Sequence, residues 1–117
     1  MGFNVLVVES DPQVARSLSS HFHSIQLMRT GEELRERVAK SHPEAVILDM
    51  EQSRLSDVRN LRYEFPSLAI VCMHRIPDEE LWVAALEAGA SDVCSTDDVQ
   101  NVVDSVLRNT IVKAGIA

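Results

Sequence analysis

The run Ala45-Val46-Ile47-Leu48-Asp49 decides the fold class, because an apolar segment of strand length ends directly in a carboxylate. A second run, Val5-Leu6-Val7-Val8, ends in the same way, in Glu9-Ser10-Asp11. Continuous apolar runs of this length are typical of parallel strands that are buried on both faces. The carboxyl ends of such strands share one edge of an open α/β sheet, and ligands bind at that edge. The two runs therefore predict an acidic site with the chemistry to handle a metal ion or a phosphate.

Strand-like and helix-like segments alternate along the chain. Strands are expected at residues 5–8, 25–28, 45–48, 69–73 and 92–95, each followed by apolar residues at helical spacing. Repeated alternation implies parallel strands joined by right-handed crossovers, with helices on both faces of the sheet. We therefore expect a three-layer α/β/α sandwich of the flavodoxin-like kind with a five-stranded parallel sheet. Periodicity does not supply the strand order, but 2-1-3-4-5 is the usual order for a chain of this length.

Several helix ends carry local signals. Asp11-Pro12 is typical of an N-cap followed by proline at the first helical position, and Gly89 is typical of a left-handed C-cap. His42-Pro43 is expected to stop the second helix, since the residue before proline is disfavoured in the α region. Capping boxes are predicted at Thr30–Glu33 and at Ser95–Asp98.

The overall composition is that of one ordinary globular domain. With 117 residues we expect one domain over residues 1–110, and residues 111–117 are expected to be the start of a linker or a disordered tail. A net charge of −7 argues against direct nucleic-acid binding, which requires clustered Lys and Arg. No apolar stretch has the length of a membrane span, and the N-terminus lacks a secretion pattern, so a cytoplasmic location is expected. Cys72 and Cys94 are expected to be reduced, buried thiols.

Four stretches, in this order and at this spacing, resemble the receiver domain of two-component response regulators: Val7–Pro12, Ala45–Met50, Phe65–Val71 and Ala85–Asp92. The resemblance covers residues 3–110. It implies a signalling module, not an enzyme, in which an aspartate accepts a phosphoryl group and becomes an acyl phosphate. A divalent cation, a lysine after strand five, a hydroxyl after strand four and an aromatic residue on strand five assist in the family.

The resemblance places the site residues on this chain. Asp49 takes the position of the phospho-acceptor, active or vestigial, and the metal positions fall on Glu9, Ser10, Asp49 and the backbone carbonyl of Glu51. Ser10 replaces the carboxylate that usually binds the metal. Since a neutral hydroxyl is a weaker Mg²⁺ ligand, we expect no cofactor, or only weakly bound Mg²⁺.

The positions that sense the phosphoryl group also depart from the family. His74 stands at the hydroxyl position, Thr96 at the lysine position and Val93 at the aromatic position. Loss of the lysine alone removes a charge-assisted bond of roughly 1.5–3 kcal/mol. The combined departures predict a pseudo-receiver that keeps the fold and loses the switch. Thr96 is equally explained as part of the cap of the last helix, and His74 as an exposed loop residue.

Three functional hypotheses follow. The first is an atypical receiver domain in two-component phosphorelay signalling that acts through phosphorylation-independent protein–protein contact. Its partner would be a kinase, an output domain, an adaptor or a second copy, bound at the face formed by the fourth helix, fifth strand and fifth helix. On that face Trp82 is expected either as an exposed anchor or as peripheral core. The second is a working receiver that uses Asp49 with Mg²⁺, with His74 in place of the hydroxyl. The third, a small enzyme or nucleotide binder, lacks any glycine-rich phosphate loop.

Overall fold

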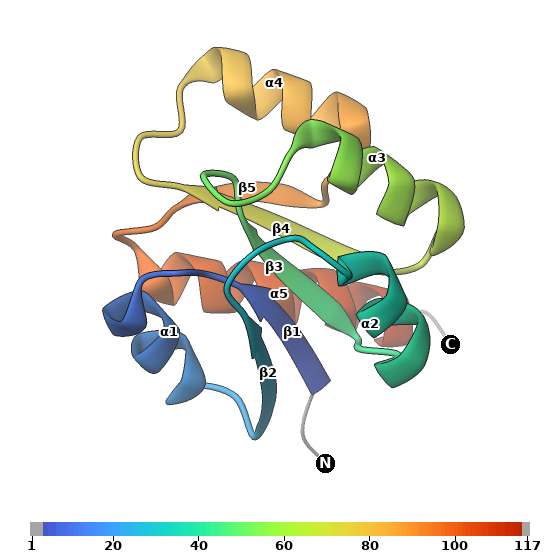
Figure 1. The fold of residues 1–117 in the computed structure, drawn as a ribbon, viewed down its shortest axis with the longest axis horizontal. Coiled ribbons are helices and arrows are strands. Elements are labelled where there is room, and N and C mark those ends of the chain that lie inside the picture. The colour runs from blue at the N-terminus through green and yellow to red at the C-terminus, as the bar shows by residue number, and fades with distance from the viewer. Residues whose placement is uncertain (1–3, 116–117) are drawn as a thin grey trace.

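A five-stranded parallel sheet forms the centre of the computed structural model, which describes residues 4–115 and the side chains of residues 4–110. The strand order is β2-β1-β3-β4-β5, so both the predicted fold class and the predicted order are confirmed (Figure 1). Adjacent strands pair in parallel throughout, which brings all their carboxyl ends to one edge. The strands are β1 (Asn4–Val8), β2 (Ser24–Met28), β3 (Ala45–Asp49), β4 (Ala69–His74) and β5 (Asp92–Ser95).

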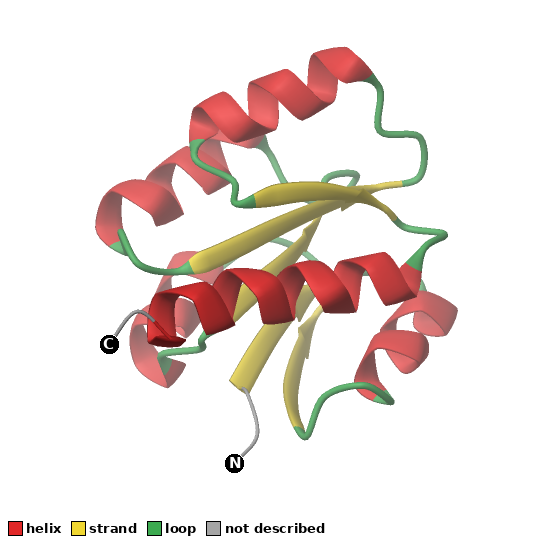
Figure 2. Ribbon diagram, turned by 180° about the vertical axis from the view of Figure 1, so that it is seen from behind, coloured by secondary structure: helices red, strands yellow, loops and turns green. Residues whose placement is uncertain are grey.

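Helices cover both faces of the sheet. Helices α2, α3 and α4 lie on one face, and α1 and α5 lie on the other, where α5 runs across the sheet (Figure 2). The arrangement is the three-layer sandwich that right-handed crossovers produce. The helices are α1 (Pro12–Ser19), α2 (Leu34–Ser41), α3 (Leu55–Glu64), α4 (Glu79–Ala88) and α5 (Val99–Gly115).

Alternate strand residues supply the two cores. In β1, Leu6 and Val8 pack towards α2, α3 and α4, whereas Val5 and Val7 pack towards α1 and α5. All four are fully buried, as expected for a strand with helices on both sides. This double burial explains why the sequence shows continuous apolar runs and not alternation of apolar and polar residues.

The two cysteines lie on opposite faces of the sheet. Cys72 pairs in register with Val93, so Cys94 is offset by one residue and points to the other side. Burial raises the pKa of Cys72 to about 12 and that of Cys94 to about 11, so both thiols stay protonated at neutral pH. The prediction of reduced, buried thiols is confirmed.

The predicted helix ends are confirmed where one residue carries the whole signal. The Asp11 side chain accepts the backbone N–H of Gln13, and Pro12 is the first residue of α1. The backbone at Gly89 has φ 118°, which ends α4 in the left-handed region. His42 ends α2 in the same region, with φ 49°. Each signal is local, so sequence alone identifies it.

The two predicted capping boxes are wrong. Helix α2 begins at Leu34, and Glu33, at φ 62°, makes no side-chain cap. The Thr30 hydroxyl instead accepts the N–H of Glu32 in the preceding turn. At α5 the cap is Asp98 itself, whose carboxylate accepts the N–H of Asn101. In both places the helix begins at a different residue from the one predicted, because several polar side chains compete there for the same backbone groups.

The last helix extends beyond the predicted domain boundary. Helix α5 runs from Val99 to Gly115, so residue 110 falls inside a helix and not at its end. No glycine or proline interrupts residues 99–114, which explains why the helix continues. Residues 116–117 of the expected linker lie outside the described residues.

Candidate functional site

An acidic pocket lies at the carboxyl edge of the sheet, where β1 and β3 end side by side. Its volume is about 290 Å³. Of the residues predicted for the site, Glu9, Asp49, Glu51 and Thr96 line it; Ser10 is exposed and does not. The pocket is lined by Glu9, Asp11, Val14, Asp49, Glu51, Arg75, Thr96 and Asp97. The parallel register brings Glu9 and Asp49 together, because Val8 of β1 pairs with Leu48 of β3 and Glu9 and Asp49 are the next residues along the chain.

Glu9 and Asp49 form the buried part of the pocket. Only 6% of Glu9 and 5% of Asp49 is exposed. Glu9 Oε2 accepts the N–H of Asp11 at 2.9 Å, while Oε1 is buried without a hydrogen-bond partner. Burial raises the pKa of Glu9 to about 7, and the adjacent charge of Asp49 adds to this rise. A protonated Glu9 can donate to Asp49, which removes both the orphaned oxygen and the repulsion.

Asp49 is held by the loop that follows it. Its Oδ1 accepts the backbone N–H of Glu51 at 3.0 Å. Burial raises the pKa of Asp49, and the hydrogen bond from the Glu51 N–H offsets only part of that rise. The carboxylate therefore keeps a fixed position with one oxygen bonded to backbone. This geometry is compatible with a nucleophile and equally with a structural acid at a strand end.

Arg75 is a member of the site that the sequence did not indicate. It follows β4 directly, lines the pocket beside Asp49, and its Nη2 lies 3.6 Å from Glu51 Oε2. The pair is largely exposed and contributes little to stability. The Arg75 side chain acts through its charge, because it places a cation in an otherwise acidic pocket that lacks the family's lysine. No spacing rule assigns a role to the residue one position after the hydroxyl position.

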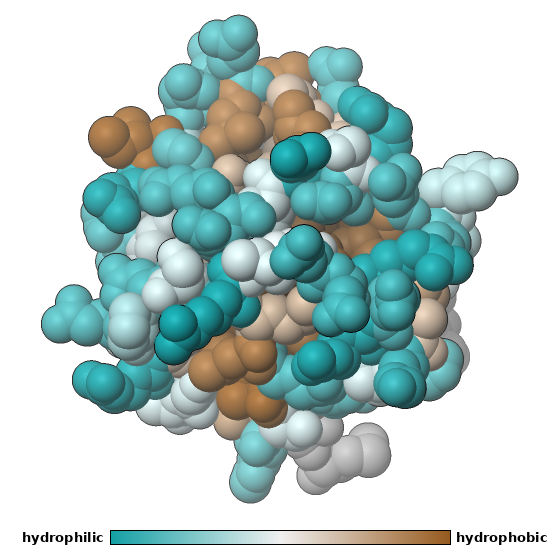
Figure 3. Space-filling view, in the orientation of Figure 1, coloured by the Kyte–Doolittle hydropathy of each residue, from teal (hydrophilic) through white to brown (hydrophobic). Residues whose placement is uncertain are grey.

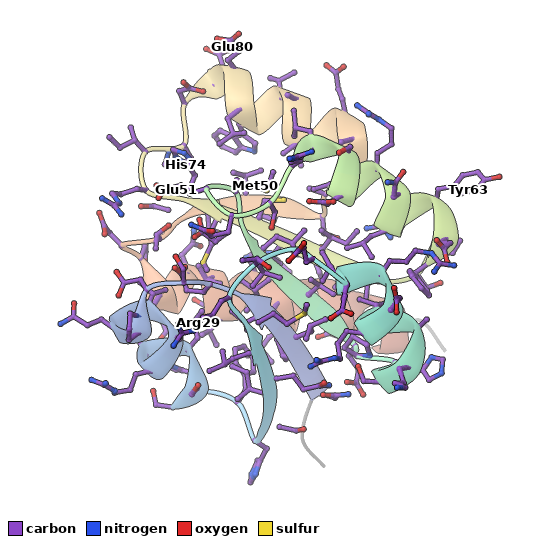
Figure 4. All side chains as sticks on the ribbon, in the orientation of Figure 1. Arg29, Met50, Glu51, Tyr63, His74 and Glu80 are labelled. Carbon is purple, nitrogen blue, oxygen red and sulfur yellow. The ribbon has the colours of Figure 1, made fainter. Side chains whose placement is uncertain are left out.

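His74 and Thr96 occupy the strand ends expected for the two phosphate-site positions. The Thr96 N–H donates to the His74 carbonyl at 3.0 Å, so the two residues end neighbouring strands together. His74 Nδ1 accepts the N–H of Ile76, which leaves Nε2 to carry the proton of the neutral ring. His74 and Glu51 lie at the same edge of the sheet (Figure 4). Of the two predicted positions, only Thr96 reaches the pocket wall.

The side chains at the pocket supply part of a cation site. Two buried carboxylates with an unpartnered oxygen are a partial cation site, since Mg²⁺ prefers oxygen ligands. Within residues 4–110, however, no three Asp, Glu, His or Cys side chains are grouped so as to hold a metal ion. The Glu51 carboxylate faces Arg75 instead. A proton on Glu9, together with the nearby Arg75 guanidinium, would offset part of the negative charge of the pocket.

A second feature lies on α4, away from the pocket. Trp82 is 49% exposed there, so the expectation of an outward-facing residue is favoured over peripheral core. Val83 and Leu86 are also exposed, while Ala85 and Ala88 face the sheet. The space-filling view shows apolar atoms over this helix (Figure 3). In the described part of the chain, no helix is long and apolar enough to cross a bilayer.

Curated relatives at the sequence level are response regulators. No family model matches the chain. The response regulator MprA of Mycolicibacterium vanbaalenii is 34% identical over 99 residues, which cover 79% of this chain and 43% of the relative. MprA of Mycobacterium tuberculosis is 33% identical over the same share of each chain. The chain thus spans less than half the length of the relatives it matches.

Solved structures share the fold. A protein assigned as a response regulator in Chloroflexus aurantiacus superposes with a TM-score of 0.84 at 22% identity, covering 94% of this chain and 98% of that one. The response regulator 1452 receiver domain of Francisella gives 0.83 at 14% identity, covering 95% and 98%. At 22% identity or less, these structural similarities show the fold. The sequence similarity to MprA, over 79% of this chain, carries the family. The chain is a receiver domain of the response regulator family found in two-component systems.

Proposed function

We propose that this domain is an atypical receiver that regulates by protein–protein contact without depending on phosphorylation. The observation that carries the proposal is the pocket itself: it keeps Glu9 and Asp49 but has Thr96 where the family has lysine. At the aromatic position, Val93 is buried in the core on the α4 side of the sheet and has no ring to change rotamer. A receiver fold without the family's lysine, hydroxyl and aromatic residue still keeps its exterior surfaces. Regulation by protein–protein contact needs only those surfaces.

The partner is proposed to be a kinase, an output domain or an adaptor that docks on the face formed by α4, β5 and α5. Trp82 supports this choice, since exposed aromatic residues are frequent anchors of interfaces. The proposal includes a cytoplasmic location and no direct contact with nucleic acid, consistent with the net charge of −7.

The test is exposure of the purified domain to acetyl phosphate with Mg²⁺, followed by intact-mass measurement. The proposal expects no stoichiometric addition of a phosphoryl group. Asp49→Asn serves as the blank, since it removes the acceptor and keeps the shape. Stoichiometric modification that is lost in Asp49→Asn would contradict the proposal.

A second candidate function is a working receiver with unusual site residues, and the position of Arg75 favours it. An Asp49 oxygen would attack phosphorus while the bond from phosphorus to the donor's leaving group breaks. Arg75, from the opposite side of the pocket mouth to β1, would pair with the transferred group in place of lysine. The proton on His74 Nε2 would replace the missing hydroxyl as a hydrogen-bond donor.

The same mass measurement separates the two candidates, and two variants identify the assisting groups. If Asp49 is modified, Arg75→Ala is expected to slow modification by about tenfold or more, since it removes a charge-assisted bond. Arg108→Ala is the matched control, because Arg108 pairs with Asp92 away from the pocket. Equal rates for both variants would remove Arg75 from the site.

A further inference from the structure

The net negative charge of the chain lies in one third of the sequence. Residues 76–110, which span α4, β5 and most of α5, contain eight acidic residues and one basic residue, Arg108. The rest of the chain contains ten acidic and ten basic residues, so the whole net charge of −7 belongs to this segment. Arg108 is already paired with Asp92 at 3.2 Å. The eight acids are Asp78, Glu79, Glu80, Glu87, Asp92, Asp97, Asp98 and Asp104.

An apolar groove lies within this acidic segment. Trp82, Val83 and Leu86 are 49%, 47% and 43% exposed on α4, and with Pro77 and Glu79 they line a shallow groove of about 500 Å³. Helix α4 has no basic residue, and Glu79, Glu80 and Glu87 are all exposed. At the top of the view, Glu80 projects from the start of α4 (Figure 4). The outer surface of α4 therefore combines an apolar groove with three exposed carboxylates and no basic residue of its own. An exposed apolar patch rimmed by polar residues is typical of an interaction site.

Charge decides which occupant fits the groove. Two copies that paired through this surface would place equally acidic segments against each other, because a two-fold interface brings the same patch together from both partners. Like charges brought together at an interface disfavour pairing, so the surface selects against a second copy. A partner that carries apolar side chains between lysines and arginines complements both the groove and its surround.

We propose that the α4 face docks a basic amphipathic polypeptide segment, whose apolar side chains cover Trp82, Val83 and Leu86 while its Lys and Arg residues face the three exposed glutamates of α4. This inference rests on the part of the proposed function that assigns docking to the α4 face, and it specifies the chemistry of the partner. It is independent of whether Asp49 accepts a phosphoryl group. The basic partner segment occupies the groove as a helix, since a helix presents apolar residues at i, i+3 and i+4 in one stripe.

Trp82 is the sole tryptophan of the chain, which makes its fluorescence a direct readout of the groove. The probe is a synthetic helical peptide of leucine and lysine at amphipathic spacing, compared with a peptide of equal length in which glutamate replaces lysine. Neither contains tryptophan. We expect the lysine peptide to shift the Trp82 emission to shorter wavelength and to bind about tenfold or more tightly than the glutamate peptide. Equal binding of the two peptides, or binding of neither, would overturn the proposal.

Matched variants locate the binding site. Leu86→Ser is expected to weaken binding by about fivefold or more, whereas Leu27→Ser, of similar exposure on the edge strand β2, leaves it unchanged. Glu79→Gln with Glu87→Gln should weaken binding more than Glu32→Gln with Glu36→Gln, a pair of exposed acids on and beside α2. Equal effects of the matched variants would mean non-specific attraction and would contradict the proposal.

The oligomeric state supplies an independent check on the same surface. Sedimentation of the chain at rising concentration is expected to show no dimer that depends on α4. A dimer that Leu86→Ser dissociates would assign the groove to a second copy and overturn the proposal. Neither result bears on the phosphoryl test at Asp49, so failure here and failure of the phosphorylation-independent function are separate outcomes.

Discussion

Glu9 and Asp49 are both buried at the base of the pocket, and this burial makes the stability of the domain depend on pH. The pKa of Glu9 is raised to about 7, mainly by burial, so the folded chain holds a proton that the unfolded chain releases near pH 4.5. Between these pH values the folded state binds more protons, and stability falls as the pH rises. The raised pKa of Asp49 acts in the same direction.

Glu9→Gln is expected to remove most of this dependence. A neutral amide of the same shape avoids the cost of burying the charge, so the variant should be about 1–3 kcal/mol more stable than the wild type at pH 8 and similar at pH 4.5. Urea unfolding across this pH range in metal-free buffer measures the difference. Glu36→Gln, an exposed acid of α2, is the control and should keep the wild-type profile. An unchanged profile in Glu9→Gln would show that Glu9 is ionised throughout.

Residues of the site differ in how far sequence could predict them. Glu9, Asp49 and Thr96 follow strands, and parallel strands must end at one edge, so their meeting in the pocket follows from the pattern alone. Asp11 reaches the pocket in place of Ser10 because the chain turns into α1 there. Arg75 was missed because the direction of a side chain in a loop is not encoded by periodicity.

At the scale of elements, the junction between α3 and α4 depends on Gly89 and Arg62. Arg62 Nε donates to the Gly89 carbonyl at 2.8 Å, and its Nη groups donate to Pro66 and Ser91. The stem of Arg62 packs so closely that a Cβ at position 89 would lie 2.7 Å from Arg62 Cβ. The end of α4 and the start of β5 are thereby tied to the end of α3.

Gly89→Ala is expected to destabilise the domain by about 2–4 kcal/mol. The substitution combines the cost of a left-handed backbone for alanine with the clash against Arg62. Gly31→Ala is the control, because its backbone is not left-handed and its closest new contact is 3.3 Å, so its loss should be smaller. Urea unfolding of both variants measures the contrast, and equal losses would count against this account of the junction.

The N-terminus of α5 allows a test of whether Asp98 or Ser95 caps the helix. Asp98 accepts the N–H of Asn101, whereas the Ser95 hydroxyl accepts the N–H of Asp97 in the preceding turn. Asp98→Ala should cost about 1 kcal/mol of stability, the usual loss for a capping aspartate, and Ser95→Ala should cost less. Thermal or urea unfolding decides between them. A larger loss for Ser95→Ala would restore the capping box predicted from sequence. Sequence could place α5 but not choose among the neighbouring polar residues 95–98.

At the scale of the whole molecule, the layers followed from the sequence because burial on both faces leaves a continuous apolar signal in every central strand. The strand order did not follow from that signal and came from the usual order for a chain of this length. The distribution of charge over the surface was harder to predict from the sequence, because the net charge of −7 does not say where the charged residues lie in the fold. Only the fold shows that the acidic segment is α4, β5 and most of α5, with the exposed apolar face of α4 within it. The molecule thus carries an acidic pocket at the carboxyl edge of the sheet and, on α4, an acidic and partly apolar exterior surface.

The central claim is that the receiver fold is kept while the phosphoryl switch at Asp49 is not. Calorimetric titration of Mg²⁺ into the domain, with and without beryllofluoride as an acyl-phosphate mimic, tests it most directly. The account predicts no saturable heat with either ligand and unchanged backbone amide resonances. Metal-dependent binding of beryllofluoride that Asp49→Asn abolishes would contradict it and establish a working phosphoryl site.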